Sequence, residues 1–321
     1  MRWGCLGASR ILGRTLLPAL RAAGETVVVL GARDGDRARV LASEWGIPEG
    51  SGYDEVIARA DLDAVYISVV NDAHVPLTIR ALASGKHVLC EKPLAPTQAE
   101  VEAVREAERA SGRRVMEAFV YGFHPQVAAL LDAVRSGALG TVVSVDAHFA
   151  NRLDDPGDFR WQARHGGGAL LDLGTYCVSL LRDVIGREPG RVAGFATVRG
   201  DVDATLAGTL DFGTAVATFG CSFDGARAQW LRVVGTGGTA FLEVPFSSRN
   251  RLVVSAVNGR QCFWPALDPY VGMVAHFVAA VAGSGLRHGT DEALRQARVL
   301  DALAESARSG GVVTVDRSSA A

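Results

Sequence analysis

The chain has 321 residues, more than a typical single domain, so two domains are expected. Its hydrophobic content of 48% and charged content of 21% are typical of a globular protein, and a formal net charge of −2 leaves no cationic excess for binding nucleic acid. We expect no membrane helix, since no apolar run reaches about 18 residues, and no signal peptide before the first strand. Five cysteines without a C-x-x-C pair predict reduced, mostly buried thiols, no metal site and a cytoplasmic location.

The first 120 residues alternate short apolar strands with helices of about ten to fifteen residues, which is typical of a parallel sheet covered on both faces. After a first strand that ends at Leu6, strands are expected at 26–31, 63–70, 87–90 and 114–118. Helices are expected up to Arg21 and at 34–45, 74–84 and 97–111, the last with Thr97 and Glu100 as a capping box. This half therefore predicts an α/β dinucleotide-binding domain over residues 1–120.

The turn after the first strand reads Gly7, Ala8, Ser9, Arg10, Ile11, where a dinucleotide fingerprint would read G-x-G-x-x-G or A. Only the first glycine is in register. The turn still opens a helix, so its backbone amides and the helix dipole can meet a pyrophosphate, and the serine can add a hydroxyl donor. The alternative is a tight turn that binds nothing.

The end of the second strand indicates which cofactor is preferred. Ala32 and Arg33 occupy the place where NAD-binding proteins carry an acid, and Arg37 follows one helical turn later. Two guanidinium groups suit the 2′-phosphate, so we expect NADPH to be favoured over NADH. Asp34 is the competing acid, but its position before a helix predicts an N-cap.

Two further loops follow strands at the same predicted sheet edge. Ser68, Val69, Asn71 and His74 come after the third strand, and either of the last two could contact the ribose or the nicotinamide. For His74 the alternative is a residue that simply begins a helix.

The fourth strand delivers Glu91, Lys92 and Pro93 to this edge, where ligands bind in open α/β sheets. Because proline fixes its own φ, the backbone beside the lysine is stiff, as suits a group that must point at one atom. The alternative is a solvated lysine in an ordinary loop.

From Tyr121 the pattern changes to long strands with a period of two, so residues 121–321 are expected to form a second domain. The predicted strands begin with 141–150 and continue at 203–212, 215–223, 229–234, 239–244 and 252–257. Helices are expected at 125–136, 169–184, 270–282 and 291–308. The pattern predicts an α+β domain with a large, mostly antiparallel open sheet.

One segment of the second half carries a candidate site. Three glycines at 166–168 precede a helix, on which Asp172 and Tyr176 are four residues apart and share a face. A carboxylate and a phenol there could grip a polyol and donate a proton; alternatively they are a dipole partner and a core aromatic. Arg160 is expected to contact the cofactor or a phosphate, and Trp161 to stack on a base or to pack.

Several of these motifs recur together in a known order. They are the N-terminal glycine turn, Ala32-Arg33, Glu91-Lys92-Pro93, Glu117-Ala118-Phe119-Val120-Tyr121, and the helix from Gly166 to Tyr176. Over essentially its whole length, the chain resembles the Gfo/Idh/MocA family of NAD(P)-dependent oxidoreductases. The Phe159-Arg160-Trp161 stretch resembles the nucleotide-sugar 3-ketoreductases within it.

The resemblance implies NADPH-dependent reduction of a keto group on a nucleotide-linked deoxysugar, by a homodimer or homotetramer that assembles through the second domain's sheet. It implies that Lys92 lies beside the nicotinamide, that Tyr176 supplies the proton with the help of Lys92, and that Asp172 and Trp161 bind substrate. A dehydrogenase of a free aldose or a dihydrodiol, and a non-catalytic dinucleotide-binding regulator, are the alternatives. Ser9 and Leu12 depart from the fingerprint, which bears most on cofactor affinity.

Overall fold

The computed structural model describes residues 1–247, 249 and 252–316, and the chain divides into two compact units. Unit 1 consists of Met1–Phe119 and Tyr270–Leu294, and unit 2 of Val120–Pro269 and Arg295–Ala321. Among the described residues, no helix is both long and apolar enough to span a membrane.

Residues 270–294, which the sequence pattern places in the second domain, pack instead with the first. Helix α8 (Pro269–Val281) is largely apolar, and its Phe277 ring lies 5.4 Å from that of Trp3 in the first strand. Further along, the His288 carbonyl accepts the Glu117 amide at 2.9 Å. Contacts with residues distant in the sequence determine that this helix packs in the core of unit 1, because nothing in its local sequence distinguishes it from the helices of unit 2.

Unit 1 contains a six-stranded sheet of order β3-β2-β1-β4-β5-β6 in which every pair is parallel, so the predicted parallel sheet is confirmed. The strands are β1 (Arg2–Leu6), β2 (Thr26–Ala32), β3 (Glu49–Gly52), β4 (Ala64–Ile67), β5 (His87–Cys90) and β6 (Val115–Glu117). This order is that of the doubly wound dinucleotide-binding fold.

Within Met1–Phe119, four helices lie where the sequence predicts them. They are a π-helical turn (Leu12–Leu16) that continues as α1 (Leu17–Ala22), α2 (Gly35–Glu44), α4 (His74–Ala83) and α5 (Gln98–Ser111), and a short helix that was not predicted, α3 (Tyr53–Ala58), lies between α2 and α4. Both predicted caps are confirmed. Thr97 and Glu100 form a reciprocal capping box, and the Asp34 carboxylate accepts the Asp36 amide at 2.9 Å and the Arg37 amide at 3.2 Å.

Unit 2 contains a nine-stranded sheet of order β14-β13-β12-β11-β7-β10-β9-β8-β15, in which only the β7–β10 pair is parallel. This confirms the mostly antiparallel sheet. Its strands are β7 (Val142–Ala150), β8 (Arg191–Arg199), β9 (Val202–Asp211), β10 (Val216–Ser222), β11 (Ala228–Gly235), β12 (Thr239–Leu242), β13 (Val253–Val257), β14 (Arg260–Trp264) and β15 (Val313–Thr314).

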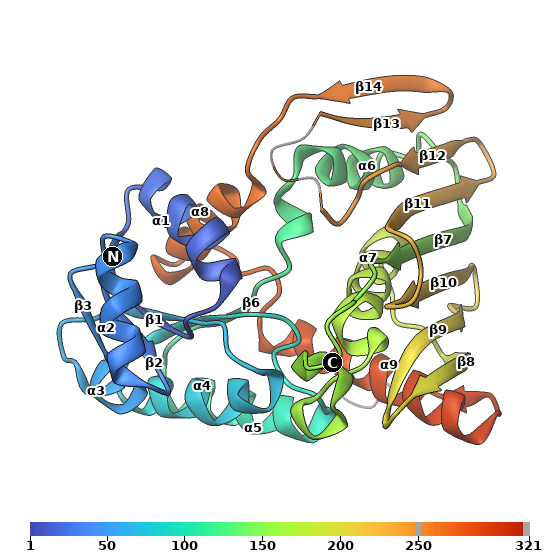
Figure 1. Cartoon of the computed structure of the whole chain (residues 1–321). Helices are drawn as coiled ribbons and strands as arrows, with labels where there is room; N and C mark the ends of the chain where they lie inside the picture. The colour runs from blue at the N-terminus through green and yellow to red at the C-terminus, as the bar shows by residue number, and fades with distance from the viewer. Residues whose placement is uncertain (248, 250–251, 317–321) are drawn as a thin grey trace. The chain divides into compact units, whose positions relative to one another are not determined.

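Helices cover one face of this sheet. They are α6 (Pro125–Arg135), α7 (Thr175–Ile185) and the part of α9 (Thr290–Ser309) that belongs to unit 2, and Figure 1 shows α7 beside the central strands β7 and β10. Along β7, Val145, Ala147 and Phe149 are buried beneath the helices, while the alternate residues face the other side. The five cysteines are free thiols, four of them buried.

Candidate functional site

The strands of unit 1 bring the predicted cofactor residues to one sheet edge. The Gly7 amide donates to the Gly31 carbonyl at 2.9 Å, the Ser68 amide to Leu6 at 2.8 Å, and the Glu91 amide to Ile67 at 2.9 Å. Because the strands are parallel, the segments after β1, β2, β4 and β5 all begin at the carboxyl edge of the sheet. That edge is where open α/β sheets bind their ligands.

The turn after β1 requires its glycine and uses its serine internally. Gly7 has φ +114°, and a Cβ there would collide with the Ser68 carbonyl oxygen. The Ser9 hydroxyl donates to the Ser68 hydroxyl at 2.8 Å and accepts the Leu12 amide at 3.1 Å. The hydroxyl that we expected to contact phosphate therefore caps the following helix and joins two loops, while Ala8, Arg10 and Ile11 remain at least partly exposed at the turn.

The basic pair after β2 lies beside an aromatic residue that the sequence did not single out. Burial raises the pKa of Tyr53, whereas the charges of Arg33 and Arg37 and a hydrogen bond to the Arg33 backbone act in the opposite direction. Both arginines are thus close enough for their charges to act on the same phenol, and both are exposed. The Asp34 carboxylate caps α2, and the two exposed guanidinium groups flank it in the sequence.

The loop after β4 carries two residues that are more buried than expected. Asn71 is buried in a 3₁₀ turn (Asn71–Ala73) that leads into α4. The His74 ring has Nδ1 2.8 Å from the Pro93 carbonyl and Nε2 3.3 Å from the Val69 carbonyl, and burial lowers its pKa to about 4. Both ring nitrogens thus face backbone oxygens, so this histidine supports the loops.

Lys92 follows β5 in unit 1, between the buried Cys90 and Pro93, and its side chain is partly exposed. The Lys92–Pro93 peptide is cis. Glu91 accepts a hydrogen bond from the buried Tyr66 hydroxyl at 2.6 Å. The residues on both sides of the lysine are therefore held by the protein interior.

In unit 2 the glycines allow the close backbone approach that the sequence predicted. The Gly168 amide donates to the Arg160 carbonyl at 2.9 Å, and a Cβ on Gly167 would collide with that same carbonyl oxygen. This approach brings Arg160 to the start of the helix, where its Nε lies 3.7 Å from the Asp172 carboxylate. An arginine and an acid therefore stand side by side near the residue that we expect to be catalytic.

The helix that carries Tyr176 begins with a π-helical turn (Leu170–Gly174) and continues as α7. The Tyr176 ring is partly exposed in unit 2, and its centroid lies 6.1 Å from Tyr121, 5.7 Å from Phe149 and 5.8 Å from Phe246. Three aromatic rings from three parts of the unit therefore fix the direction of the phenol. Packing against these three rings therefore sets the plane of the Tyr176 ring.

Asp203, which no sequence motif singled out, anchors the start of this helix. Its carboxylate accepts the Leu170 amide at 2.6 Å, and burial raises its pKa to about 6. It lies at the beginning of β9, 33 residues further along the chain, so only the fold brings it to the helix.

Trp161 packs within unit 2. The Arg199 guanidinium lies 4.4 Å from the centre of its ring, and the Phe223 ring meets it edge-on at 5.2 Å. Its Nε1 is buried and has no hydrogen-bond partner in the described part of the chain.

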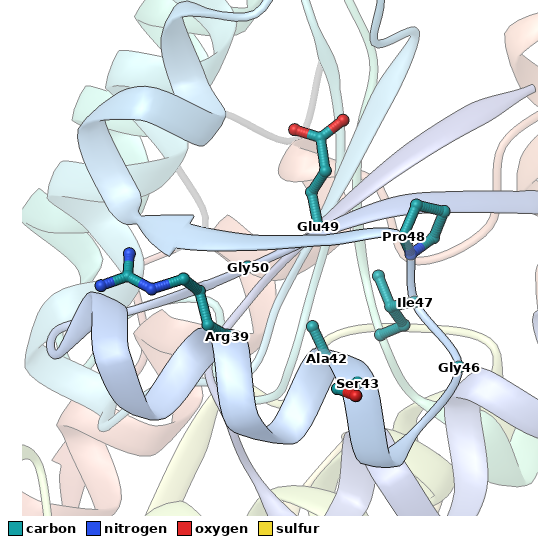
Figure 2. Close-up of a pocket in the computed structure, with 8 residues that line it drawn as sticks. All are labelled: Arg39, Ala42, Ser43, Gly46, Ile47, Pro48, Glu49 and Gly50. Atoms are coloured by element: carbon teal, nitrogen blue, oxygen red, sulfur yellow. The ribbon is translucent and has the colours of Figure 1, made fainter.

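A cavity of about 650 Å³ opens elsewhere in unit 1, between α2 and the amino end of β3 (Figure 2). Arg39 and Ala42 line it from the helix, and Glu49 and Gly50 line it from the start of the strand. This cavity lies at the opposite end of the strands from the turn at Gly7. It is therefore separate from the edge where the cofactor residues gather.

Comparison with known proteins agrees with these features. Residues 1–119 match the model of the oxidoreductase family with an NAD-binding Rossmann fold, and residues 127–241 match the GFO/IDH/MocA C-terminal domain. The chain is 35% identical to D-xylose 1-dehydrogenase (NADP(+)) 2 of Haloferax volcanii, covering 98% of this chain and 100% of that protein. It is 34% identical to a dTDP-3,4-didehydro-2,6-dideoxy-alpha-D-glucose 3-reductase of Streptomyces violaceoruber, with coverage of 96% and 95%.

Among solved structures, that of KijD10, a 3-ketoreductase from Actinomadura kijaniata in complex with NADP and TDP-benzene, superposes with a TM-score of 0.89. The identity is 29%, over 95% of this chain and 97% of that one. With a six-stranded parallel sheet, a glycine turn at its carboxyl edge and relatives matched over nearly their full length, the chain belongs to the GFO/IDH/MocA family of NAD(P)-binding oxidoreductases that act on alcohol and carbonyl groups.

Proposed function

We propose that the protein is an NADPH-dependent ketoreductase that reduces a keto group on a deoxysugar linked to a nucleotide. The observation that most supports this proposal is the match over 96% of the chain to a dTDP-sugar 3-reductase, together with a lysine at the carboxyl edge of the parallel sheet. The Phe159-Arg160-Trp161 stretch, which resembles that group of enzymes, supports the nucleotide-linked substrate.

The residues of unit 1 fit the cofactor. Gly7 lets the backbone amides of its turn approach a pyrophosphate, and Arg33 and Arg37 offer two exposed guanidinium groups to a 2′-phosphate. When bound, NADPH supplies the hydride for the carbonyl carbon. Comparing the dissociation constants of NADPH and NADH by fluorescence titration tests the preference, and tighter binding of NADH would refute it.

We assign the proton chemistry to Lys92 and Tyr176. As the carbonyl is reduced, negative charge develops on its oxygen, and the Tyr176 phenol donates a proton to that atom. The Lys92 ammonium stabilises the same charge and favours proton release from the phenol. Asp172, held beside Arg160, accepts hydrogen bonds from a neighbouring sugar hydroxyl and orients the ring.

The direct test is a pair of substitutions. Tyr176→Phe and Lys92→Ala should each lower kcat by about 10²–10⁴-fold, since this is the usual contribution of acid catalysis, and should change the Kd for NADPH far less. Phe149→Leu, which alters the packing around the phenol but leaves its hydroxyl, serves as the control. Full turnover in both variants would remove these two residues from the mechanism.

Oxidation of a free aldose is the second candidate, because the similarity to the D-xylose dehydrogenase is equally strong. A substrate panel separates the two functions. Turnover of xylose or glucose with NADP⁺, without any nucleotide on the sugar, would favour the dehydrogenase. Turnover of a dTDP-linked 3-keto sugar with NADPH, and none of the free sugar, would favour the ketoreductase.

The uncovered face of the unit 2 sheet supports assembly into a homodimer or homotetramer. Phe195 on β8 is 72% exposed there, and Val216 on β10 and Val234 on β11 are each about half exposed on the same face. Apolar side chains gathered on one face mark an interaction surface. Light scattering should show that Phe195→Asp weakens the oligomer, whereas Val40→Asp on α2, at an equally exposed valine of unit 1, leaves it intact.

A further inference from the structure

Buried side chains hold the chain on both sides of Lys92. The Tyr66 hydroxyl donates to Glu91 at 2.6 Å, and the Leu94 amide donates to the Glu117 carboxylate at 2.8 Å. Tyr66 is fully buried and Glu117 is 3% exposed. The segment that presents the lysine is therefore tied to β4 and to β6.

His74 supplies the third tie, to the backbone of the residue that directly follows the lysine. Its Nδ1 lies 2.8 Å from the carbonyl oxygen of Pro93, the residue after Lys92, and its Nε2 lies 3.3 Å from that of Val69. One ring thus bridges the segments that follow β4 and β5. The His74 side chain is 1% exposed, so bulk water does not compete for these two contacts.

The chemistry of the ring fixes which contact is the stronger. A carbonyl oxygen can only accept, so a hydrogen bond to Pro93 requires the proton on Nδ1. Burial lowers the pKa of His74 to about 4, so the ring is neutral near pH 7 and carries a single proton. We therefore place that single proton on Nδ1, in the shorter contact, so that the ring donates to the Pro93 carbonyl beside Lys92.

We infer that His74 is a positioning residue that acts through Lys92, a role that rests on the proposed function of that lysine. Lysine has a flexible four-carbon side chain, so the place of its ammonium depends on a fixed backbone. Without the ring, the Pro93 carbonyl loses its donor in a buried place, and the segment shifts. A misplacement of about 1 Å at a reacting group lowers rates by about 10²-fold.

The test is a double-mutant cycle between His74→Leu and Lys92→Ala, with kcat and the Kd for NADPH measured for each variant. His74→Leu alone should lower kcat by about 10- to 100-fold. In the Lys92→Ala background it should have almost no further effect, because there is no ammonium left to position. His74→Asn, whose amide can donate in place of Nδ1, should recover much of the rate. If the leucine variant folds poorly, His74→Asn replaces it in the cycle.

His87→Leu is the matched control. His87 lies at the other end of β5 and its Nδ1 accepts the Arg114 amide at 3.0 Å, so its loss disturbs the same strand away from the lysine. It should leave kcat nearly unchanged.

The outcomes separate the two proposals. If the effects of His74→Leu and Lys92→Ala multiply, His74 does not act through the lysine and this inference is overturned, while the role of Lys92 stands. If Lys92→Ala retains full turnover, the role of the lysine fails, and the positioning role fails with it.

Discussion

The partly buried acid of β9 that anchors the start of the Tyr176 helix leads to a testable prediction about stability. Asp203 accepts the Leu170 amide, yet burial raises its pKa from 3.8 to about 6, because the charged form loses more hydration than the hydrogen bonds return. The folded protein therefore binds a proton here more tightly than the unfolded chain does. The stabilisation is complete below pH 3.8 and is lost as the pH rises through 6.

The size of the effect follows from the shift. About two pKa units at 1.36 kcal/mol each give about 3 kcal/mol as the upper end of the pH-dependent contribution. Asp203→Asn keeps a side-chain oxygen to accept the Leu170 amide but removes the titration. Relative to this variant, the wild-type protein should lose about 2 kcal/mol of unfolding free energy between pH 4.5 and pH 7.5, because about a third of the total is already lost at pH 4.5.

Urea unfolding followed by circular dichroism at a series of pH values measures this difference, with the transition of unit 2 fitted separately if the units unfold apart. Asp201→Asn removes an exposed carboxylate two residues away, which accepts the Ala163 amide at 3.2 Å, and controls for the loss of one negative charge. A difference between wild type and Asp203→Asn that stays constant or grows with pH would refute the reasoning.

Three further predictions concern unit 1. Gly7→Ala should lower the unfolding free energy by more than about 1–3 kcal/mol and weaken NADPH binding, because the added Cβ collides with its surroundings in addition to the strain of φ +114°. Gly24→Ala is the control, since Gly24 has φ +79° but open space around it. In thermal melts it should show the effect of the backbone strain alone. Replacing both Arg33 and Arg37 by alanine should reduce the NADPH-over-NADH preference by at least about 10-fold in titrations, since charged hydrogen bonds are worth about 1.5–3 kcal/mol, and an unchanged ratio would contradict the assignment. The pKa of His74 falls from 6.5 to about 4 on folding, because burial disfavours the charged ring. As the pH drops from 6.5 to 4, the wild type should therefore lose up to about 3 kcal/mol of unfolding free energy relative to His74→Asn. A difference between the two urea midpoints that stays the same over that pH range would argue against it.

Some residues of the candidate site could be recognised from short sequence motifs, and others could not. Glu91-Lys92-Pro93 and the glycines before Tyr176 are short motifs, visible because each is a run of unusual residues in one place. Tyr66 and Asp203 are single residues in ordinary strands, and their partners lie 25 and 33 residues away. Nothing local distinguishes them, so only the folded chain shows what they hold.

The sequence by itself determined the elements whose causes are local: apolar strands alternating with helices, the caps at Asp34 and Thr97, and the change to period-two strands. Each depends on neighbours within a few residues, which the order of amino acids already specifies. The tertiary structure alone decided that β3, a Glu-Gly-Ser-Gly stretch with no strand-forming residue, pairs with β2, and that α8 packs in unit 1. In both cases the stabilising partner lies far along the chain, and its contribution exists only once the sheet and the core have formed.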